Sequence, residues 1–178
     1  KLEMEIRTAA VEREQAHTDR NLARKLTPAE RRKKKERKLF DDPNTLETIV
    51  SVYKVNDLSH VQTRFKVDVN AQENRLTGCI VTCDTMTLII VEGGSKPIKR
   101  YNKLMLQRIK WATAVKESDD ADVEHPQQVN RCVLVWQGSV AKPMFEKFTA
   151  QQCRTEAAAR KYLVDAGVGH YWDLAANF

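Results

Sequence analysis

The spacing of apolar and polar residues divides the chain into a polar N-terminal segment and a longer segment with alternating strand and helix patterns. Residues 1–26 contain neither Gly nor Pro and are rich in Glu, Arg and Ala, which predicts a polar helix with little to bury. The stretch Thr-Pro-Ala-Glu that begins at Thr27 matches a capping box, so a second helix is expected from Thr27 to about Leu39. Residues 41–44 predict the end of that helix and a hinge.

The longer segment follows the order strand, helix, strand, strand, helix, strand. The predicted strands cover residues 48–56, 76–83, 87–91 and 131–138, and the predicted helices cover residues 58–69 and 96–110. In the first of these helices, Phe65, Val67 and Val69 also alternate as they would in a strand. The order predicts an α+β fold of the ferredoxin-like (split βαβ) type, an antiparallel sheet with two helices on one face. Residues 144–153 are a candidate for a further strand, and a capped helix over residues 155–166 is expected as a C-terminal helical extension.

The composition fits one globular domain with an appendage and excludes several classes of protein. The 178 residues are 42% hydrophobic, and no apolar run reaches the roughly 18 residues that a membrane helix needs. Four cysteines with apolar neighbours, Cys79, Cys83, Cys132 and Cys153, indicate reduced, buried thiols of a cytosolic or nuclear protein. The cysteines and histidines show no zinc spacing and no catalytic motif is present, so neither a metal, a cofactor, a small-molecule substrate nor a catalytic residue is predicted.

The net charge of +6 lies entirely in the N-terminal segment. Residues 1–40 hold 13 Lys and Arg against 7 Asp and Glu, whereas the remaining 138 residues hold 17 of each. We expect residues 1–43 to form a basic helical arm and residues 44–178 to form the ferredoxin-like domain, with a solvated acidic loop at 112–130. A basic arm on a neutral domain indicates a polyanionic partner, either nucleic acid or an acidic membrane.

The cations of the basic arm are concentrated in its second half. They are Arg24, Lys25, Arg31, Arg32, Lys33, Lys34, Lys35, Arg37 and Lys38. Only two carboxylates oppose them, and like charges three or four positions apart on a helix repel one another. A polynucleotide relieves this repulsion and releases condensed counterions, so these residues are candidates for RNA or DNA contact. The alternatives are a solvated helix face or a nuclear-localisation signal.

A second basic cluster occupies the helix predicted at residues 96–110. Its candidate RNA-binding residues are Gly93, Gly94, Lys96, Lys99, Arg100, Lys103 and Arg108. The cations from Lys96 to Lys103 fall on one face opposite an apolar stripe, and no acidic residue lies between Gly93 and Trp111. They are placed to follow a phosphate backbone, while the helix N-terminus after the glycines offers amides to one phosphate. The alternative is an ordinary amphipathic helix with lysines on its solvated side.

The aromatic residues divide into core candidates and base-stacking candidates. Tyr53 and Trp136 lie in predicted strands and are expected in the core. Trp111 and Tyr171 are retained as RNA-binding candidates because bases of a single strand stack on such rings. The alternative for the C-terminal aromatics is that they attach the end of the chain to the domain.

Several motifs together resemble a known family. They are Ala-Arg-Lys-Leu-Thr at residues 23–27, IVSVYKVNDL at 49–58, LTG at 76–78, VEGG at 91–94, LMLQRIKW at 104–111, CVLVWQG at 132–138 and HYWDL at 170–174. Over essentially the whole chain, the sequence resembles the C-terminal region of the pre-mRNA-processing factor three family, subunits of the spliceosomal U4/U6 small nuclear ribonucleoprotein. The resemblance implies a nuclear protein without enzymatic activity or membrane attachment, whose partners are U4/U6 snRNA and other proteins of the U4/U6 particle and the tri-snRNP. It also implies that the arm binds a U4/U6 stem and that the domain binds the adjoining single-stranded U6 segment, which supports tri-snRNP assembly in splicing.

The residues of the domain do not fit the usual way in which a ferredoxin-like sheet binds RNA. In the RNA recognition motif the third strand displays aromatic rings, but here residues 87–91 hold none. We therefore expect RNA to contact the basic helix, its glycine loop and nearby edges. Two other functions remain open at this point. One is a protein-interaction module without direct RNA contact, and the other is an acylphosphatase-like hydrolase, which needs a paired Arg and Asn at a phosphate loop.

Overall fold

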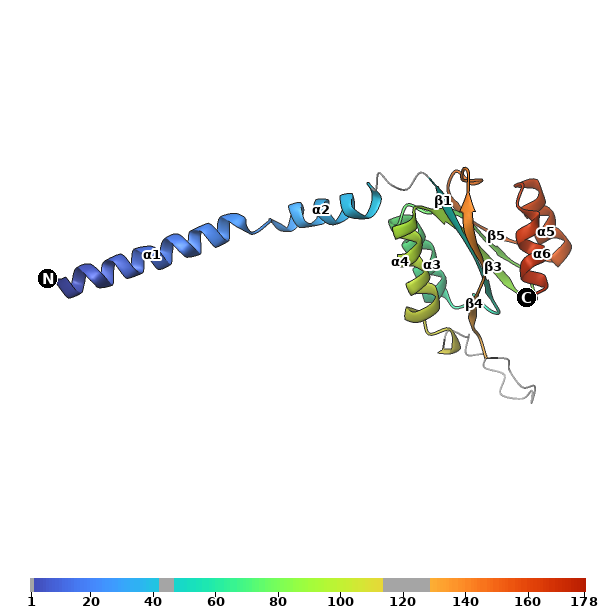
Figure 1. Cartoon of the computed structure of the whole chain (residues 1–178). Helices are drawn as coiled ribbons and strands as arrows, with labels where there is room; N and C mark the ends of the chain where they lie inside the picture. Colours follow the sequence, from blue (N-terminus) through green and yellow to red (C-terminus); the bar gives the residue numbers. More distant parts are fainter. Residues whose placement is uncertain (1, 42–46, 114–128) are drawn as a thin grey trace. The chain divides into compact units, whose positions relative to one another are not determined.

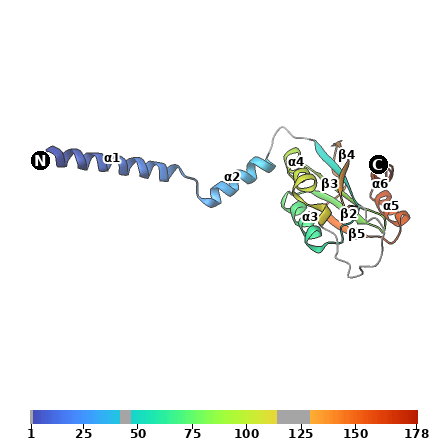
Figure 2. The same cartoon turned by 90° about the horizontal axis from the view of Figure 1, so that it is seen from below.

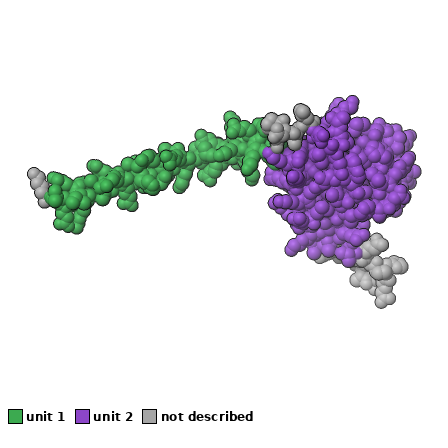
Figure 3. Space-filling view, viewed as in Figure 1, with its two compact units in different colours: residues 1–42 green, residues 43–178 purple. Residues whose placement is uncertain are grey.

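The structure is a computed structural model that describes residues 2–41, 47–113 and 129–178 (Figure 1). The chain divides into two compact units, residues 1–42 and residues 43–178 (Figure 3). Most of the hinge expected at residues 41–44 and of the acidic loop expected at 112–130 lies outside the described residues.

The N-terminal unit consists of two helices, α1 (Leu2–Arg24) and α2 (Pro28–Phe40), as predicted. The capping box at the start of α2 is present in full. The Glu30 amide donates to Thr27 Oγ1 at 3.2 Å, and the Thr27 amide donates to Glu30 Oε2 at 2.7 Å. Every side chain of the two helices is exposed or partly exposed. Their stability therefore rests on local capping and propensity, because neither helix contributes a buried face.

The C-terminal unit is a five-stranded sheet with helices. Its elements are β1 (Thr48–Val55), α3 (Val61–Glu73), β2 (Thr77–Thr82), β3 (Thr87–Gly93), α4 (Ser95–Lys103), η1 (Leu104–Arg108), η2 (Trp111–Thr113), β4 (Cys132–Val140), β5 (Phe148–Gln152), α5 (Glu156–Asp165) and α6 (Gly169–Ala176). The strand order is β4-β1-β3-β2-β5, and the first four strands are antiparallel neighbours. The ferredoxin-like, split βαβ prediction is confirmed for these four strands, and residues 61–73 are helical.

The fifth strand corrects the expectation of a wholly antiparallel sheet. β5 pairs with β2 in parallel, from the pair Gly78 and Phe148 to the pair Thr82 and Gln152. The reason is topological. β4 runs antiparallel to β1 at one edge of the sheet, and β2 runs in the direction of β1. After β4 the chain reverses direction and crosses to the opposite edge of the sheet. β5 therefore runs opposite to β4, in the same direction as β1 and β2, and pairs with β2 in parallel.

Helices cover both faces of this sheet (Figures 1 and 2). The sheet therefore has one hydrophobic core on each face, and alternate residues of β1 contribute to different cores. Tyr53 packs with α3, α4 and η1, whereas Val52 packs with α5 and α6. Burial on both faces accounts for the nearly continuous apolar runs of β1 and β3. The expected C-terminal helical extension thus forms a second layer over the sheet face that an RNA recognition motif leaves open to bases.

Candidate nucleic-acid interface

Helix α4 presents its cations to solvent and its apolar side chains to the sheet. Pro97, Ile98 and Tyr101 are buried against the first core, as the apolar stripe predicts. All five cations of α4 and η1 are exposed, and together they line one shallow depression of about 330 Å³: Lys96, Lys99, Arg100, Lys103 and Arg108. We call these five residues the α4 surface. The structure thus brings together the five cations of the second cluster that the sequence nominated as RNA-binding residues.

The end of the helix differs from the regular helix predicted at residues 96–110. After Lys103 the backbone widens into one π-helical turn, in which the Ile109 amide donates to the Leu104 carbonyl at 3.0 Å. A π turn holds more residues per turn than an α-helix, so it rotates Arg108 less far from Lys103, and Arg108 lines the α4 surface. A regular α-helix would turn Arg108 far from Lys103, since five residues advance about 500° around the axis. Local sequence patterns did not indicate this turn.

Polar contacts on the inner side hold α4 in place. The Tyr101 hydroxyl donates to the Val67 carbonyl of α3 at 3.0 Å. On the other side, the Tyr53 hydroxyl donates to the Asn102 side chain, whose amide nitrogen donates to Gln137 Oε1 of β4 at 2.9 Å. These contacts tie α4 to a helix and to two strands, so the helix backbone that carries the α4 surface is held in place.

The two nominated aromatic rings lie in the cores. Trp111 is 6% exposed, and its indole N–H donates to the Met105 carbonyl at 2.7 Å, which satisfies a carbonyl at the end of the π turn. Tyr171 is 2% exposed and stacks on Trp136 with ring centroids 5.5 Å apart, and burial raises the pKa of its hydroxyl. Neither ring offers a face to a base in this structure, so we leave both out of the proposed interface. Tyr171 instead attaches α6 to β4, and Tyr53 is fully buried as expected.

The two nominated glycines adopt conformations open to other residues. Gly93 ends β3, and Gly94 is the N-cap of α4 with φ −68° and ψ 158°. A Cβ on Gly93 would lie 2.4 Å from Leu76 Cδ2, so the end of the Leu76 side chain would have to shift to admit one. Gly94 has room for a Cβ, and it brings no capping side chain to the first turn of α4.

The carboxylate nearest to this loop in sequence is turned away from the α4 surface. Glu92 is 1% exposed and accepts hydrogen bonds from the Met144 amide at 3.0 Å, the Phe145 amide at 3.1 Å and Thr77 Oγ1 at 3.1 Å. Alternation along β3 places Glu92 on the face of Ile90, which is the face covered by α5 and α6. The Glu92 side chain therefore anchors the loop between β4 and β5, on the side of the sheet opposite α4.

The cations of the basic arm surround α2. Arg24, Lys25 and all seven cations between Arg31 and Lys38 are exposed. Seven cations in eight consecutive positions, broken only by Glu36, cover every side of the helix. Any face that α2 turns to a partner is therefore cationic, unlike α4, whose charge lies on one side.

Burial disfavours the thiolate form at three of the four cysteines. Burial raises the pKa of both Cys79 and Cys132 to about 12, and desolvation, followed by the neighbouring Cys83, raises that of Cys153. A thiol with a raised pKa stays protonated near neutral pH and is a poor nucleophile. Within the described part of the chain, no group of three His, Cys, Asp or Glu residues is placed to hold a metal, and no helix is long and apolar enough to cross a membrane.

The fold and its charged face define a ferredoxin-like domain with a cationic helix surface, preceded by a cationic helical unit. Residues 51–175 match the family model of the small nuclear ribonucleoprotein Prp3, C-terminal domain, and the chain belongs to this family. It is 64% identical over 179 residues to Protein RDM16 of Arabidopsis thaliana, a match that covers 100% of this chain and 23% of the relative. It is 33% identical over 188 residues to the U4/U5/U6 small nuclear ribonucleoprotein prp3 of Schizosaccharomyces pombe, covering 100% of this chain and 34% of the relative.

The chain thus spans about a quarter to a third of the length of these relatives. Among solved structures, an acylphosphatase from Coxiella burnetii aligns with a TM-score of 0.38 and 16% identity, over 59% of this chain and 93% of that one. A likeness this weak carries no argument about function, and the acylphosphatase-like alternative gains nothing from it.

Proposed function

We propose that this chain is the RNA-binding part of a spliceosomal U4/U6 small nuclear ribonucleoprotein protein, which acts in the nucleus without enzymatic activity. Its ligand in this proposal is U4/U6 snRNA, bound at a double-stranded stem and at the adjoining single-stranded U6 segment, so that it supports tri-snRNP assembly. Support comes from membership of the Prp3 C-terminal family and from the name of the fission yeast relative, a U4/U5/U6 small nuclear ribonucleoprotein.

The observation that carries the proposal is the α4 surface. Five cations line one depression on a helix that polar contacts hold in place, and the nearest carboxylate in sequence is buried on the other side of the sheet. A solvated helix face usually mixes charges of both signs, whereas a phosphate backbone requires positive charge alone. Phosphate contacts position a protein on RNA and carry little sequence information, so this surface fits recognition by shape and charge.

The two cationic regions suit different RNA forms. In the proposal α2, with cations on every side, binds the phosphates of the duplex stem, and the domain binds the single strand that continues from it. Two weak sites on one chain bind a two-part ligand far more tightly than either part alone, provided that both sites engage at once. The overall affinity then depends on the junction between duplex and single strand.

We expect a duplex with a single-stranded overhang to bind at least about 100-fold more tightly than the blunt duplex or the free single strand. The measurement is a fluorescence-anisotropy titration of the whole chain with the three RNAs at one fixed salt concentration. A control duplex carries an overhang of equal length replaced by an uncharged linker, which removes the phosphates and keeps the bulk. Equal affinity for all RNAs would contradict the proposal that the two sites bind the RNA together.

One observation favours an additional protein partner for α1. This helix is nearly neutral, with four Arg against five Asp and Glu between Leu2 and Arg24, and its Leu2, Met4 and Ile6 side chains are 72%, 74% and 60% exposed. A polar helix with exposed apolar side chains becomes ordered most readily on a protein surface. Other U4/U6 or tri-snRNP proteins are therefore the proposed partners of α1, while α2 remains the RNA-binding helix.

A further inference from the structure

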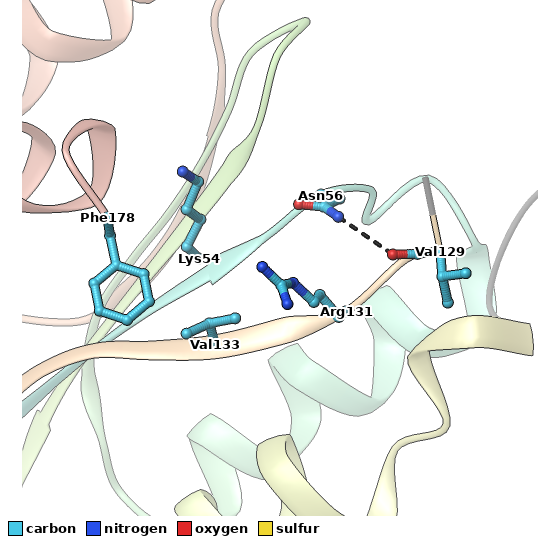
Figure 4. Close-up of a pocket in the computed structure, with 6 residues that line it drawn as sticks. All are labelled: Lys54, Asn56, Val129, Arg131, Val133 and Phe178. Carbon is cyan, nitrogen blue, oxygen red and sulfur yellow. Dashed lines mark hydrogen bonds between the residues drawn. The ribbon is translucent and has the colours of Figure 1, made fainter. Parts of the chain in front are cut away.

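A second hollow lies at one corner of the domain, outside the α4 surface. It has a volume of about 470 Å³ and is lined by Lys54, Asn56, Val129, Arg131, Val133 and Phe178 (Figure 4). We call it the corner hollow. It forms where β1 ends, where β4 begins, and where the chain leaves α6, so three segments far apart in sequence contribute to it.

The corner hollow occupies the part of the sheet face that the C-terminal helices leave uncovered. Lys54 and Val133 lie on the same face as Val52 and Val135, which pack against α5 and α6. The Lys54 ammonium donates to the Ala175 carbonyl in the last turn of α6 at 3.0 Å, which marks where that cover ends. The corner hollow is therefore a remnant of the face on which other ferredoxin-like domains bind single strands.

Hydrogen bonds between β1 and β4 fix the floor of the corner hollow. The Asn56 backbone amide donates to the Arg131 carbonyl and its side-chain amide to the Val129 carbonyl, both at 3.4 Å. Behind them Asn130, only 3% exposed, accepts from the Asp57 amide at 2.9 Å and donates to the Asp57 carbonyl at 2.8 Å. Arg131 thus projects from a braced strand end.

The lining combines two kinds of chemistry. The polar part of the lining consists of two cations, Lys54 and Arg131, and the amide of Asn56. The described residues that line the corner hollow include no carboxylate. The apolar part of the lining consists of the Phe178 ring and the Val133 side chain. The side chains of Lys54, Arg131 and Phe178 surround the same space (Figure 4). Phe178 is 63% exposed, so core packing does not account for its position. A ligand that satisfies this lining has an anionic group and a flat, largely apolar group.

We propose that the corner hollow binds one nucleotide of the single-stranded RNA, with its phosphate at Arg131 and Lys54 and its base stacked on the Phe178 ring. The volume lies within the range of sites that hold one small organic group, about 300 to 1,000 Å³. The open side leaves room for the strand to enter and leave. The inference rests on the proposed function, because it names where the domain holds the single strand.

The test compares variants of the whole chain in titrations with a single strand, a blunt duplex and the duplex with an overhang. We expect Phe178→Ala and Arg131→Ala each to weaken binding of the single strand and of the overhang RNA about tenfold, because one stacked base or one phosphate contact is lost. Blunt-duplex affinity stays unchanged. Leu174→Ala and Lys161→Ala are the controls, since the first removes an exposed apolar side chain from α6 and the second removes an exposed cation from α5.

A second readout uses a single strand that contains 4-thiouridine, irradiated in complex with the chain and analysed by mass spectrometry. The proposal expects a crosslink to Phe178. Unchanged single-strand affinity in both variants, or crosslinks that avoid Phe178, overturns the inference while the overhang preference stands. Loss of the overhang preference in the unaltered chain indicates instead that the proposed function itself has failed.

Discussion

Replacement of Lys33, Lys34 and Lys35 by Ala is expected to weaken duplex binding about 100-fold at about 0.1 M salt. The slope of log affinity against log salt concentration should also become shallower by about two to three, because each lost phosphate contact removes about one released counterion. The three side chains are exposed and α2 buries no face, so the change removes charge without disturbing packing. Alanine also favours helix at least as well as lysine, which excludes unfolding of α2 as the cause. Titrations at four or more salt concentrations measure both quantities.

The matched control removes the same number of cations from α1. Arg7, Arg13 and Arg20 are exposed and belong to the same N-terminal unit, so their joint replacement by Ala changes the net charge equally. We expect this control to keep most of the affinity and nearly the original salt slope. Equal losses in both variants would mean that the arm attracts RNA only through its total charge, and that α2 has no special role.

Reversal of charge on the α4 surface is expected to have the second large effect. Lys99→Glu together with Lys103→Glu places two carboxylates one helical turn apart among the remaining cations. Binding of the single strand and of the overhang RNA should fall by about two orders of magnitude, because two phosphate contacts are lost and two repulsions replace them. Blunt-duplex affinity should change much less. The same anisotropy titrations measure the effect.

The control for this variant carries the same charge change on the opposite side of the domain. Arg154→Glu with Lys161→Glu alters two exposed cations, one just before α5 and one within it. Thermal unfolding of both variants checks that the domain remains folded. If the α5 control loses as much single-strand affinity as the α4 variant, the α4 surface has no specific part in binding.

Local patterns in the sequence predicted most of the elements and the residues of the α4 surface. The capping box at Thr27 is a short-range signal and appears in the structure as expected. The apolar stripe of Ile98, Tyr101 and Met105 fixed which side of the helix faces the sheet, and hence which cations face solvent. These features depend on spacings of three or four residues, which a single sequence displays directly.

The features that the sequence did not predict arise from longer-range contacts. The π turn at Leu104–Arg108 depends on how the helix end packs, including the contact of Trp111 with the Met105 carbonyl. The parallel pairing of β5 follows from the sheet edge at which the chain arrives, which strand patterns do not encode. The corner hollow combines β1, β4 and Phe178, and its residues have no shared motif in the sequence. Trp111 and Tyr171 were nominated for stacking because aromatic residue type alone does not reveal burial.

The second helical layer explains how this fold would bind RNA without aromatic rings on its third strand. α5 and α6 cover the sheet face next to Leu88 and Ile90, so bases do not reach the centre of that face. What remains accessible is the outer side of α4 and, at one corner, the end of β1 beside β4. A domain built in this way favours contacts with the backbone of the strand over the reading of several consecutive bases.

The central claim is that the cations of α2 and of the α4 surface face the RNA backbone. Lysine acylation of the whole chain, with and without the duplex that carries an overhang, tests it most directly when the modified residues are quantified by mass spectrometry. We expect RNA to protect Lys33, Lys34, Lys35, Lys99 and Lys103 strongly, while the exposed Lys161 of α5 reacts equally in both states. Full reactivity of the α2 and α4 lysines in a saturated complex would contradict it.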